Sequence, residues 1–209
     1  MLKNIMPFHG TSVSGNLGAL NYPAIDSKTK DLIDKAEDTD DQLKWNAAAE
    51  ATKEKGKAAF KAKDWPRAFA YFESASGIGD ADYASIEYNA GRALEEWAKS
   101  AEKKGDLGTA KQAATNAVSW FKMAYDTATA TNKVATMNDA QQKIAYMKSQ
   151  ITYLAGLKKD PKTGKVIASK PKPKDTGTTN TDGDTTAAGG STMAILAGLG
   201  LLWWAFKEK

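Results

Sequence analysis

The stretch that decides the fold is residues 49–78, AEATKEKGKAAFKAKDWPRAFAYFESASGI. Small and aromatic residues recur along it at spacings of twelve, four and three positions: Gly56, Ala68, Phe72 and Ala75. Two helices that pack closely need a small residue or a filling ring at such positions. Asp64 can cap a helix, and Pro66 suits a first helical turn, where a missing N–H does no harm. The stretch therefore predicts two helices joined by a turn at residues 63–66.

This spacing resembles the tetratricopeptide repeat, a family of antiparallel helix pairs. In that family a small residue lets the two helices approach, and an Ala-x3-Phe-x2-Ala run on the second helix fills the contact. The sequence departs from the family pattern at Thr52, Lys63 and Asp80, where the family has Trp, Gly and Pro. The resemblance implies an all-α fold built from tetratricopeptide-like helical hairpins.

A second copy of the pattern begins at Ala84. Gly91 follows Gly56 by 35 residues, and the second-helix run returns as Ala117, Phe121 and Ala124. Gly91 and Ala117 are 26 positions apart, against twelve in the first copy, and the surplus of fourteen equals about four helical turns. We therefore expect two extra turns on each helix of the second pair, with the turn displaced to residues 104–108.

Further helices are predicted on both sides of these pairs. Residues 25–36 form a short amphipathic pattern with Asp26 or Ser27 as its N-cap. The first repeat helix is expected over residues 41–62, with Leu43 and Trp45 among its buried side chains. Residues 133–157 predict one long amphipathic helix that covers the open end of the stack, or alternatively a coiled coil. Its apolar stripe is Val134, Met137, Ala140, Ile144, Met147, Ile151 and Leu154.

Composition excludes several kinds of site. The 209 residues include no cysteine and one histidine, so a thiolate centre or a multi-histidine metal site is excluded within one chain. His9 is expected to face solvent. The run at residues 178–183 resembles a calcium loop but lacks the first acidic ligand and has Gly189 in place of the bidentate glutamate. We expect no enzymatic activity, cofactor or metal.

The net charge of +4 is unevenly distributed along the chain. Residues 158–174 carry +6, so the rest sums to about −2, and basicity belongs to a tail segment. That segment has no aromatic side chains on which bases could stack, which disfavours nucleic acid as a partner. Binding to anionic lipid headgroups and a role as a soluble spacer both remain open.

Four regions follow from these patterns: an irregular arm over residues 1–24, a helical domain over 25–157, a flexible Lys-, Pro-, Thr- and Gly-rich linker over 158–186, and a hydrophobic segment over 187–209. Residues 187–206 carry no charged side chain and as a helix would be about 30 Å long, the thickness of a bilayer's hydrocarbon core.

The hydrophobic segment is predicted to be a membrane anchor, with docking on a protein as the alternative. Its anchor residues are Met193, Ile195, Leu196, Leu199, Leu201, Leu202, Trp203, Trp204 and Phe206. The small residues on one face would allow self-association: Gly190, Ala194 and Gly198. Lys207 and Lys209 favour a cytoplasmic C-terminus, but the absence of a secretory signal favours a cytoplasmic helical domain, which we expect.

The resemblance also implies a binding groove along the first helix of each pair. It maps groove positions onto Glu50, Lys53, Lys57, Phe60, Lys61, Ser85, Tyr88, Asn89 and Arg92. Lys53 and Asn89 match positions that hold a peptide's terminal carboxylate in some members of the family. The expected function is a membrane-tethered adaptor or scaffold that binds a partner polypeptide. The alternative is a structural subunit of a particle or envelope complex, such as a virion with a membrane.

Overall fold

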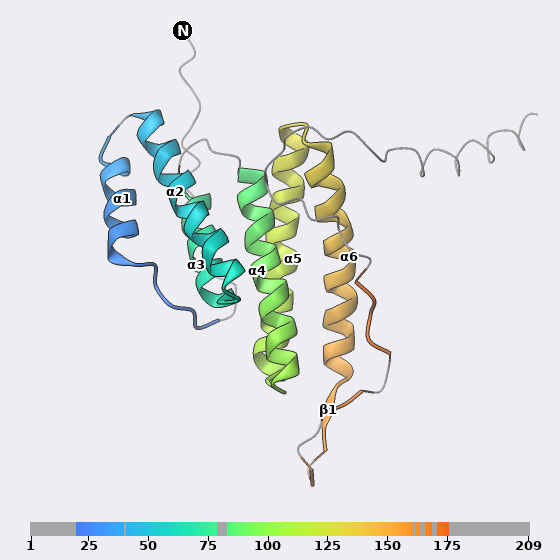
Figure 1. The fold of residues 1–209 in the computed structure, drawn as a ribbon. Helices are drawn as coiled ribbons and strands as arrows, with labels where there is room; N and C mark the ends of the chain where they lie inside the picture. Colours follow the sequence, from blue (N-terminus) through green and yellow to red (C-terminus); the bar gives the residue numbers. More distant parts are fainter. Residues whose placement is uncertain are drawn as a thin grey trace, which may run out of the picture. The chain divides into compact units, whose positions relative to one another are not determined.

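The computed structural model describes residues 20–39, 41–78, 83–160, 162–163, 166–168 and 171–175. This part of the chain is all-α, with six helices and one two-residue β-ladder (Figure 1). The elements are α1 (Ser27–Glu37), α2 (Gln42–Lys61), α3 (Trp65–Ser76), α4 (Tyr83–Lys103), α5 (Leu107–Ala130), α6 (Val134–Gly156), β1 (Lys158–Lys159) and β2 (Val166–Ile167). The ladder is antiparallel and pairs Lys158 with Ile167.

Several predictions concern residues outside these ranges. They are the arm up to residue 19 with His9, the calcium-like run at 178–189, the linker beyond residue 175, and the anchor and self-association residues of 187–209. None of the helices in the described part of the chain combines the length and the apolarity needed to cross a bilayer.

Each successive helix packs against the one before it, and close contact is made at two glycines. A Cβ placed on Gly56 would lie 2.7 Å from Phe72 Cε1, and one on Gly91 would lie 2.8 Å from Phe121 Cδ1. Both phenylalanines are almost fully buried. All eight positions predicted to pack the repeat are buried: Gly56, Ala68, Phe72, Ala75, Gly91, Ala117, Phe121 and Ala124.

Helices α4 and α5 are longer than α2 and α3. Gly56 lies five residues before the end of α2, whereas Gly91 lies twelve before the end of α4. Phe72 follows the start of α3 by seven residues, and Phe121 follows the start of α5 by fourteen. Each helix of the second pair is therefore seven residues longer on this side, which is about two turns. The connecting turn falls inside the predicted residues 104–108.

Three of the turns between helices have the same construction. Lys63, Gly105 and Asn132 each have a positive φ, at 61°, 71° and 57°. The next residue is the N-cap of the following helix, and its N–H donates to a carbonyl five residues back, as from Asp64 to Ala59 at 3.0 Å. This is the bonding of a helix that ends in a left-handed residue. The chain therefore reverses after α2, α4 and α5 by one recurring turn.

The carboxylate of Asp26 helps to hold helix α1 against α2 and α3. Asp26 caps α1 by accepting from the Thr29 N–H at 3.1 Å. It also accepts from the Tyr71 hydroxyl at 2.6 Å and from Lys55 Nζ at 3.0 Å, so it joins α1 to α3 and α2. The hydrogen bond from Tyr71, with those from Thr29 and Lys55, lowers the pKa of Asp26. The predicted N-cap therefore also serves as a tertiary contact.

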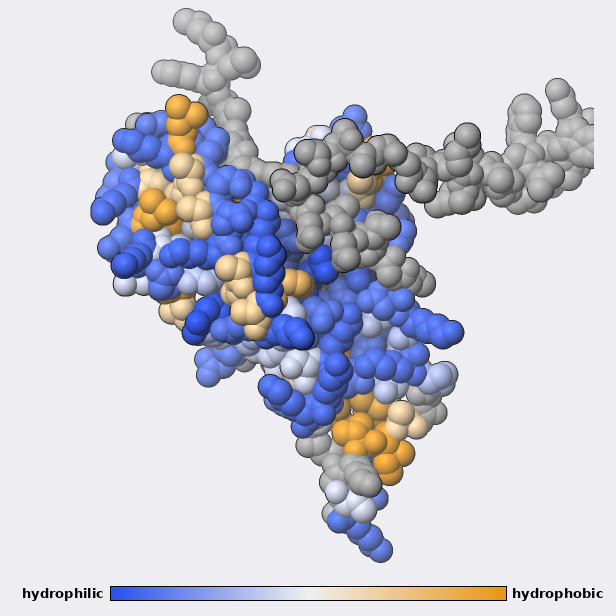
Figure 2. Space-filling model, viewed as in Figure 1, coloured by the Kyte–Doolittle hydropathy of each residue, from blue (hydrophilic) through white to orange (hydrophobic). Residues whose placement is uncertain are grey.

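Two predicted core positions are wrong. Leu43 is 79% exposed and Val134 is 55% exposed, because each lies in the first turn of its helix, where no neighbouring helix covers it. The face of the molecule that is seen in Figure 2 is mainly hydrophilic, with small apolar patches. Periodicity identified the apolar side of α2 and α6 but not the point at which packing begins.

The segment after α6 also differs from the prediction of a flexible linker. Residues 158–159 and 166–167 form the β-ladder, and residues 171–175, which we call the strap, run back along α6 (Figure 1). Lysine, proline and aspartate without periodicity predict a solvated chain. The contacts of the strap are instead ion pairs between residues distant in sequence.

Candidate functional site

The predicted groove positions on α2 are largely engaged with their own helix. Lys53 is 7% exposed, and its Nζ donates to Glu50 Oε1 at 2.7 Å. Lys57 Nζ lies 2.8 Å from Glu54 Oε1. Lys61, in the last turn, is exposed. Because Lys53 is both buried and paired, it is not an open site for a peptide carboxylate.

On α4, the structure separates the predicted groove positions into two kinds. Tyr88 is 4% exposed and its ring centre lies 5.4 Å from that of Phe121, so it belongs to the core and its assignment to the groove is corrected. Tyr88 lies three residues before Gly91 and therefore on the same face of α4, which packs into the core. Ser85, Asn89 and Arg92 are half-buried.

Phe60 and Arg92 are brought together across α2 and α4. The guanidinium carbon of Arg92 lies 5.2 Å from the centre of the Phe60 ring, within range of a cation–π interaction. Phe60 also packs edge-on against Trp65, with ring centres 4.9 Å apart. These two predicted groove residues therefore form one aromatic and cationic surface.

A pocket of about 400 Å³ lies at the step between the shorter first pair and the longer second pair. The turn at residues 62–66 forms one wall, including Trp65. Trp97 and Ser100 of α4, with Lys104 just after its end, form the other wall. The pocket exists because α4 continues past the end of α2. Sequence reasoning predicted that extension but did not single out Trp97.

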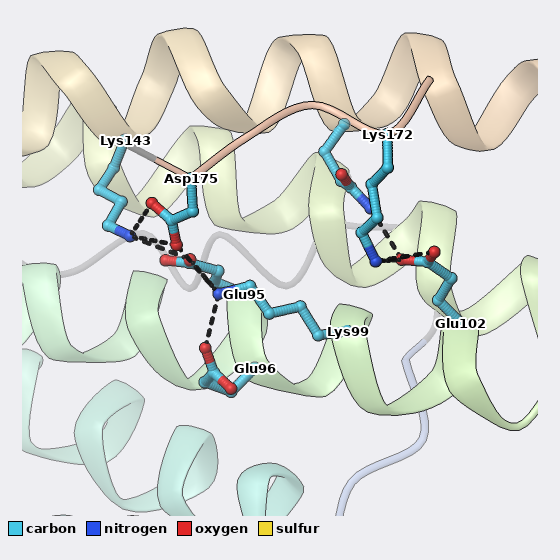
Figure 3. Close-up of polar contacts among 8 residues, drawn as sticks. Glu95, Glu96, Lys99, Glu102, Lys143, Lys172 and Asp175 are labelled. Atoms are coloured by element: carbon cyan, nitrogen blue, oxygen red, sulfur yellow. Dashed lines mark hydrogen bonds and ion pairs between the residues drawn. The ribbon is translucent and has the colours of Figure 1, made fainter. Parts of the chain in front are cut away.

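A buried cluster of charged side chains lies between α4 and α6 (Figure 3). The Glu95 side chain is 2% exposed and its Oε1 lies 2.7 Å from Lys99 Nζ and 3.0 Å from Lys143 Nζ. Lys99 also reaches Glu96 at 2.8 Å. Burial opposes the charge on Lys99, but Glu95 and Glu96 outweigh it and raise its pKa. The helices thus meet through paired charges.

The strap adds a third acid to this cluster. Asp175 Oδ1 lies 3.1 Å from Lys143 Nζ, and Oδ2 lies 3.2 Å from Lys99 Nζ. Partial burial alone would raise the pKa of Asp175, but Lys143 and Lys99 overcome that effect and lower it to about 2. The carboxylate is therefore ionised throughout the physiological range.

The other end of the strap is held by a second ion pair. Lys172 Nζ lies 2.7 Å from Glu102 Oε2, and Gln150 Nε2 on α6 donates to the same oxygen at 2.9 Å. Tyr146 lies beneath the lysines of the cluster, with Lys99 Nζ 5.7 Å and Lys143 Nζ 5.5 Å from its ring centre. Burial raises the pKa of Tyr146 to about 12, so its hydroxyl stays protonated.

The sequence carried a partial signal for this cluster. Glu95 and Lys99 stand four residues apart, a spacing that pairs charges on one helix face. The contacts of Lys143 with Glu95 and with Asp175 cross 48 and 32 residues, so no local spacing in the sequence indicates them. Without coordinates, they could not be distinguished from solvated charges.

Fold and site together define an all-α protein in which paired charged side chains of α4 and α6 lie beneath a strap from the chain itself. We call this row of side chains the channel; it consists of Glu95, Lys99, Glu102 and Lys143. Comparisons with models of protein families, with curated proteins and with solved structures gave no match.

A separate buried carboxyl lies between α4 and α5. Glu87 is 8% exposed. Burial raises its pKa to about 7, with a further contribution from the nearby charge of Asp126, while a hydrogen bond with Thr127 acts in the opposite direction. Glu87 is therefore partly protonated at neutral pH in the folded protein.

Replacement of Glu87 by glutamine is expected to stabilise the protein at high pH. An unfolded glutamate has an ordinary pKa of 4.5, so as the pH rises from 4.5 to 7 the unfolded chain loses a proton that the folded chain retains, and folded stability falls. Glu87→Gln should raise the free energy of unfolding by about 2 kcal/mol at pH 8, since the pKa shift is discounted for partial contact with solvent, and change it little at pH 4. Urea unfolding at both pH values measures this. Exposed Glu37→Gln is the control, and equal effects at both pH values would contradict the expectation.

Proposed function

We propose that this protein is a membrane-tethered adaptor that holds a partner polypeptide on a tetratricopeptide-like helical scaffold. Two observations support the scaffold. The Gly56–Phe72 contact recurs with the same close approach as the Gly91–Phe121 contact, and the two glycines are 35 residues apart. The turns after α2 and α4 share the same positive φ and bonding, at Lys63 and Gly105. Recurrence of packing and turn together is the property of a repeat.

The observation that carries the binding role is the surface made by Phe60, Arg92, Trp65 and Trp97 beside the pocket. Aromatic and arginine side chains are the residue types that most often dominate the energy of protein interfaces. A pocket of about 400 Å³ is large enough to receive one large side chain of a partner. This surface supports an interaction site more directly than Lys53, whose ammonium is paired within α2.

A cross-linking pull-down from native membranes tests the adaptor role. We expect Arg92→Ala combined with Trp97→Ala to reduce recovery of the partner at least tenfold, because the two substitutions remove the cation–π contact and one pocket wall. The matched control is Lys122→Ala, at an exposed position of α5. Unchanged recovery with the double variant would contradict the assignment of this surface.

The tether is tested separately by deleting residues 187–209, which should move the protein from the membrane pellet to the supernatant. If the shortened protein still sediments with membranes, the tether lies elsewhere. Recovery of the full chain in a large stoichiometric complex that resists detergent would instead favour a structural subunit of a particle.

A further inference from the structure

The strap contacts the helices through two side chains of opposite charge, Lys172 and Asp175. Their separation along the strap matches the separation of their partners along α4. Lys172 pairs with Glu102, and Asp175 reaches the lysines bound to Glu95 (Figure 3). Three residues of extended chain span about 10 Å, and the seven residues from Glu95 to Glu102 along a helix also span about 10 Å. Prolines at positions 171 and 173 favour the extended backbone that this match requires.

The groups that receive the strap are held by the helices themselves. Glu95 is nearly fully buried and accepts from both Lys99 and Lys143. Lys143 is 5% exposed. Its ammonium can donate three hydrogen bonds, and one of them goes to Glu95. Gln150 donates to Glu102 from α6. The channel therefore presents lysine donors for a carboxylate at one end and a carboxylate for a lysine at the other.

The strap itself is held less firmly than the channel beneath it. The side chains of Lys172 and Asp175 are 44% and 31% exposed, against 2% for Glu95. The Lys172–Glu102 pair is reached by solvent and contributes little net free energy, whereas Asp175 is held by the buried Lys143. The strap is consequently suited to exchange with a similar segment.

We propose that the channel between α4 and α6 is a docking site for an extended segment of another polypeptide that carries a lysine and, three residues later, an aspartate or glutamate. The strap occupies this site in cis and competes with the incoming segment. A tethered competitor acts at an effective concentration in the millimolar range, so it lowers the apparent affinity for the free segment. This site uses different side chains from the Phe60–Arg92 surface, so each proposal can fail without the other.

A labelled peptide with the sequence of residues 169–177, SKPKPKDTG, tests the proposal by fluorescence anisotropy with the full-length protein in detergent micelles. Lys172→Ala combined with Asp175→Asn removes both strap charges and should open the channel. We expect this variant to bind the peptide at least tenfold more tightly than the wild type does. A peptide with asparagine in place of its aspartate should bind the opened variant at least tenfold more weakly.

The control variant changes the same strap without touching its two ion pairs. Lys174 is exposed, and Lys174→Ala should leave the affinity for the peptide at the wild-type value. Raising the salt concentration should weaken binding to the opened variant, since the recognition is between charges. Equal peptide affinity for the opened variant and the wild type would overturn the proposal, and so would an opened variant that does not distinguish the aspartate from the asparagine peptide. Circular dichroism of each variant verifies that the helices are intact.

Discussion

Replacing Gly91 with alanine is expected to lower the free energy of unfolding by about 2 kcal/mol. The added Cβ would lie 2.8 Å from both Cδ1 and Cε1 of Phe121, closer than carbon atoms tolerate. Phe121 is fully buried, so its ring cannot move aside into solvent. Overpacking of this kind costs about 1–3 kcal/mol, and it outweighs the gain of about 1 kcal/mol that alanine offers over glycine within a helix. Urea unfolding followed by circular dichroism measures the difference.

The same substitution at Gly108 provides a control of opposite sign. Gly108 lies in the first turn of α5, where a Cβ would meet its nearest neighbour, Asp106 Oδ1, at 3.6 Å, an ordinary contact. Gly108→Ala should therefore be neutral or slightly stabilising through helix propensity alone. If Gly91→Ala behaves like Gly108→Ala, the close contact is not the reason for glycine at position 91.

A second substitution in the Gly91→Ala protein tests the cause. Phe121→Leu removes the ring atoms that clash, and although it costs stability in the wild type, it should cost less when alanine is already present. The two effects should therefore not add, as expected for residues in contact. Gly56 and Phe72 offer an independent repeat of the experiment, because a Cβ on Gly56 would lie 2.7 Å from the Phe72 ring.

Helix starts and turns could be predicted from the sequence alone, because they depend on residues close together in the chain. Asp64 and Pro66 mark the start of α3, and the fourteen-residue surplus between Gly91 and Ala117 locates the turn between α4 and α5. These signals are local because caps, turns and glycine–aromatic contacts depend on residue type at fixed spacing. The start of α3 and the turn between α4 and α5 lie at the residues that the sequence indicated.

The remaining features depend on where one element ends relative to another. Leu43 has the spacing of a core residue but lies beyond the covering helices, and Tyr88 has the spacing of a groove residue but packs on Phe121. The pocket beside Trp97 exists because two helices have different lengths. The ion pairs of Asp175 follow no period at all. Long-range charge pairing leaves no pattern in a single sequence, so the candidate site was predicted less completely than the fold.

Replacing Lys143 with methionine is expected to destabilise the protein by about 3 kcal/mol, the larger of these two effects. Methionine preserves most of the side-chain volume but removes the ammonium that lies 3.0 Å from Glu95 and 3.1 Å from Asp175. Glu95 is almost fully buried and would keep Lys99 as its remaining cation. A buried carboxylate that loses a partner bears a desolvation cost that is no longer offset. Chemical unfolding at neutral pH measures the loss.

Two comparisons separate this charge effect from a packing effect. Lys148→Met changes an exposed lysine on the same helix and should alter stability by less than about 0.5 kcal/mol. Adding Glu95→Gln to Lys143→Met neutralises the orphaned acid, so the double variant should be more stable than Lys143→Met alone. If it is instead less stable by the full cost of both substitutions, the two side chains contribute independently. In that case α4 and α6 are joined by packing around Tyr146 and Met147, and the ion pairs determine only where the strap lies.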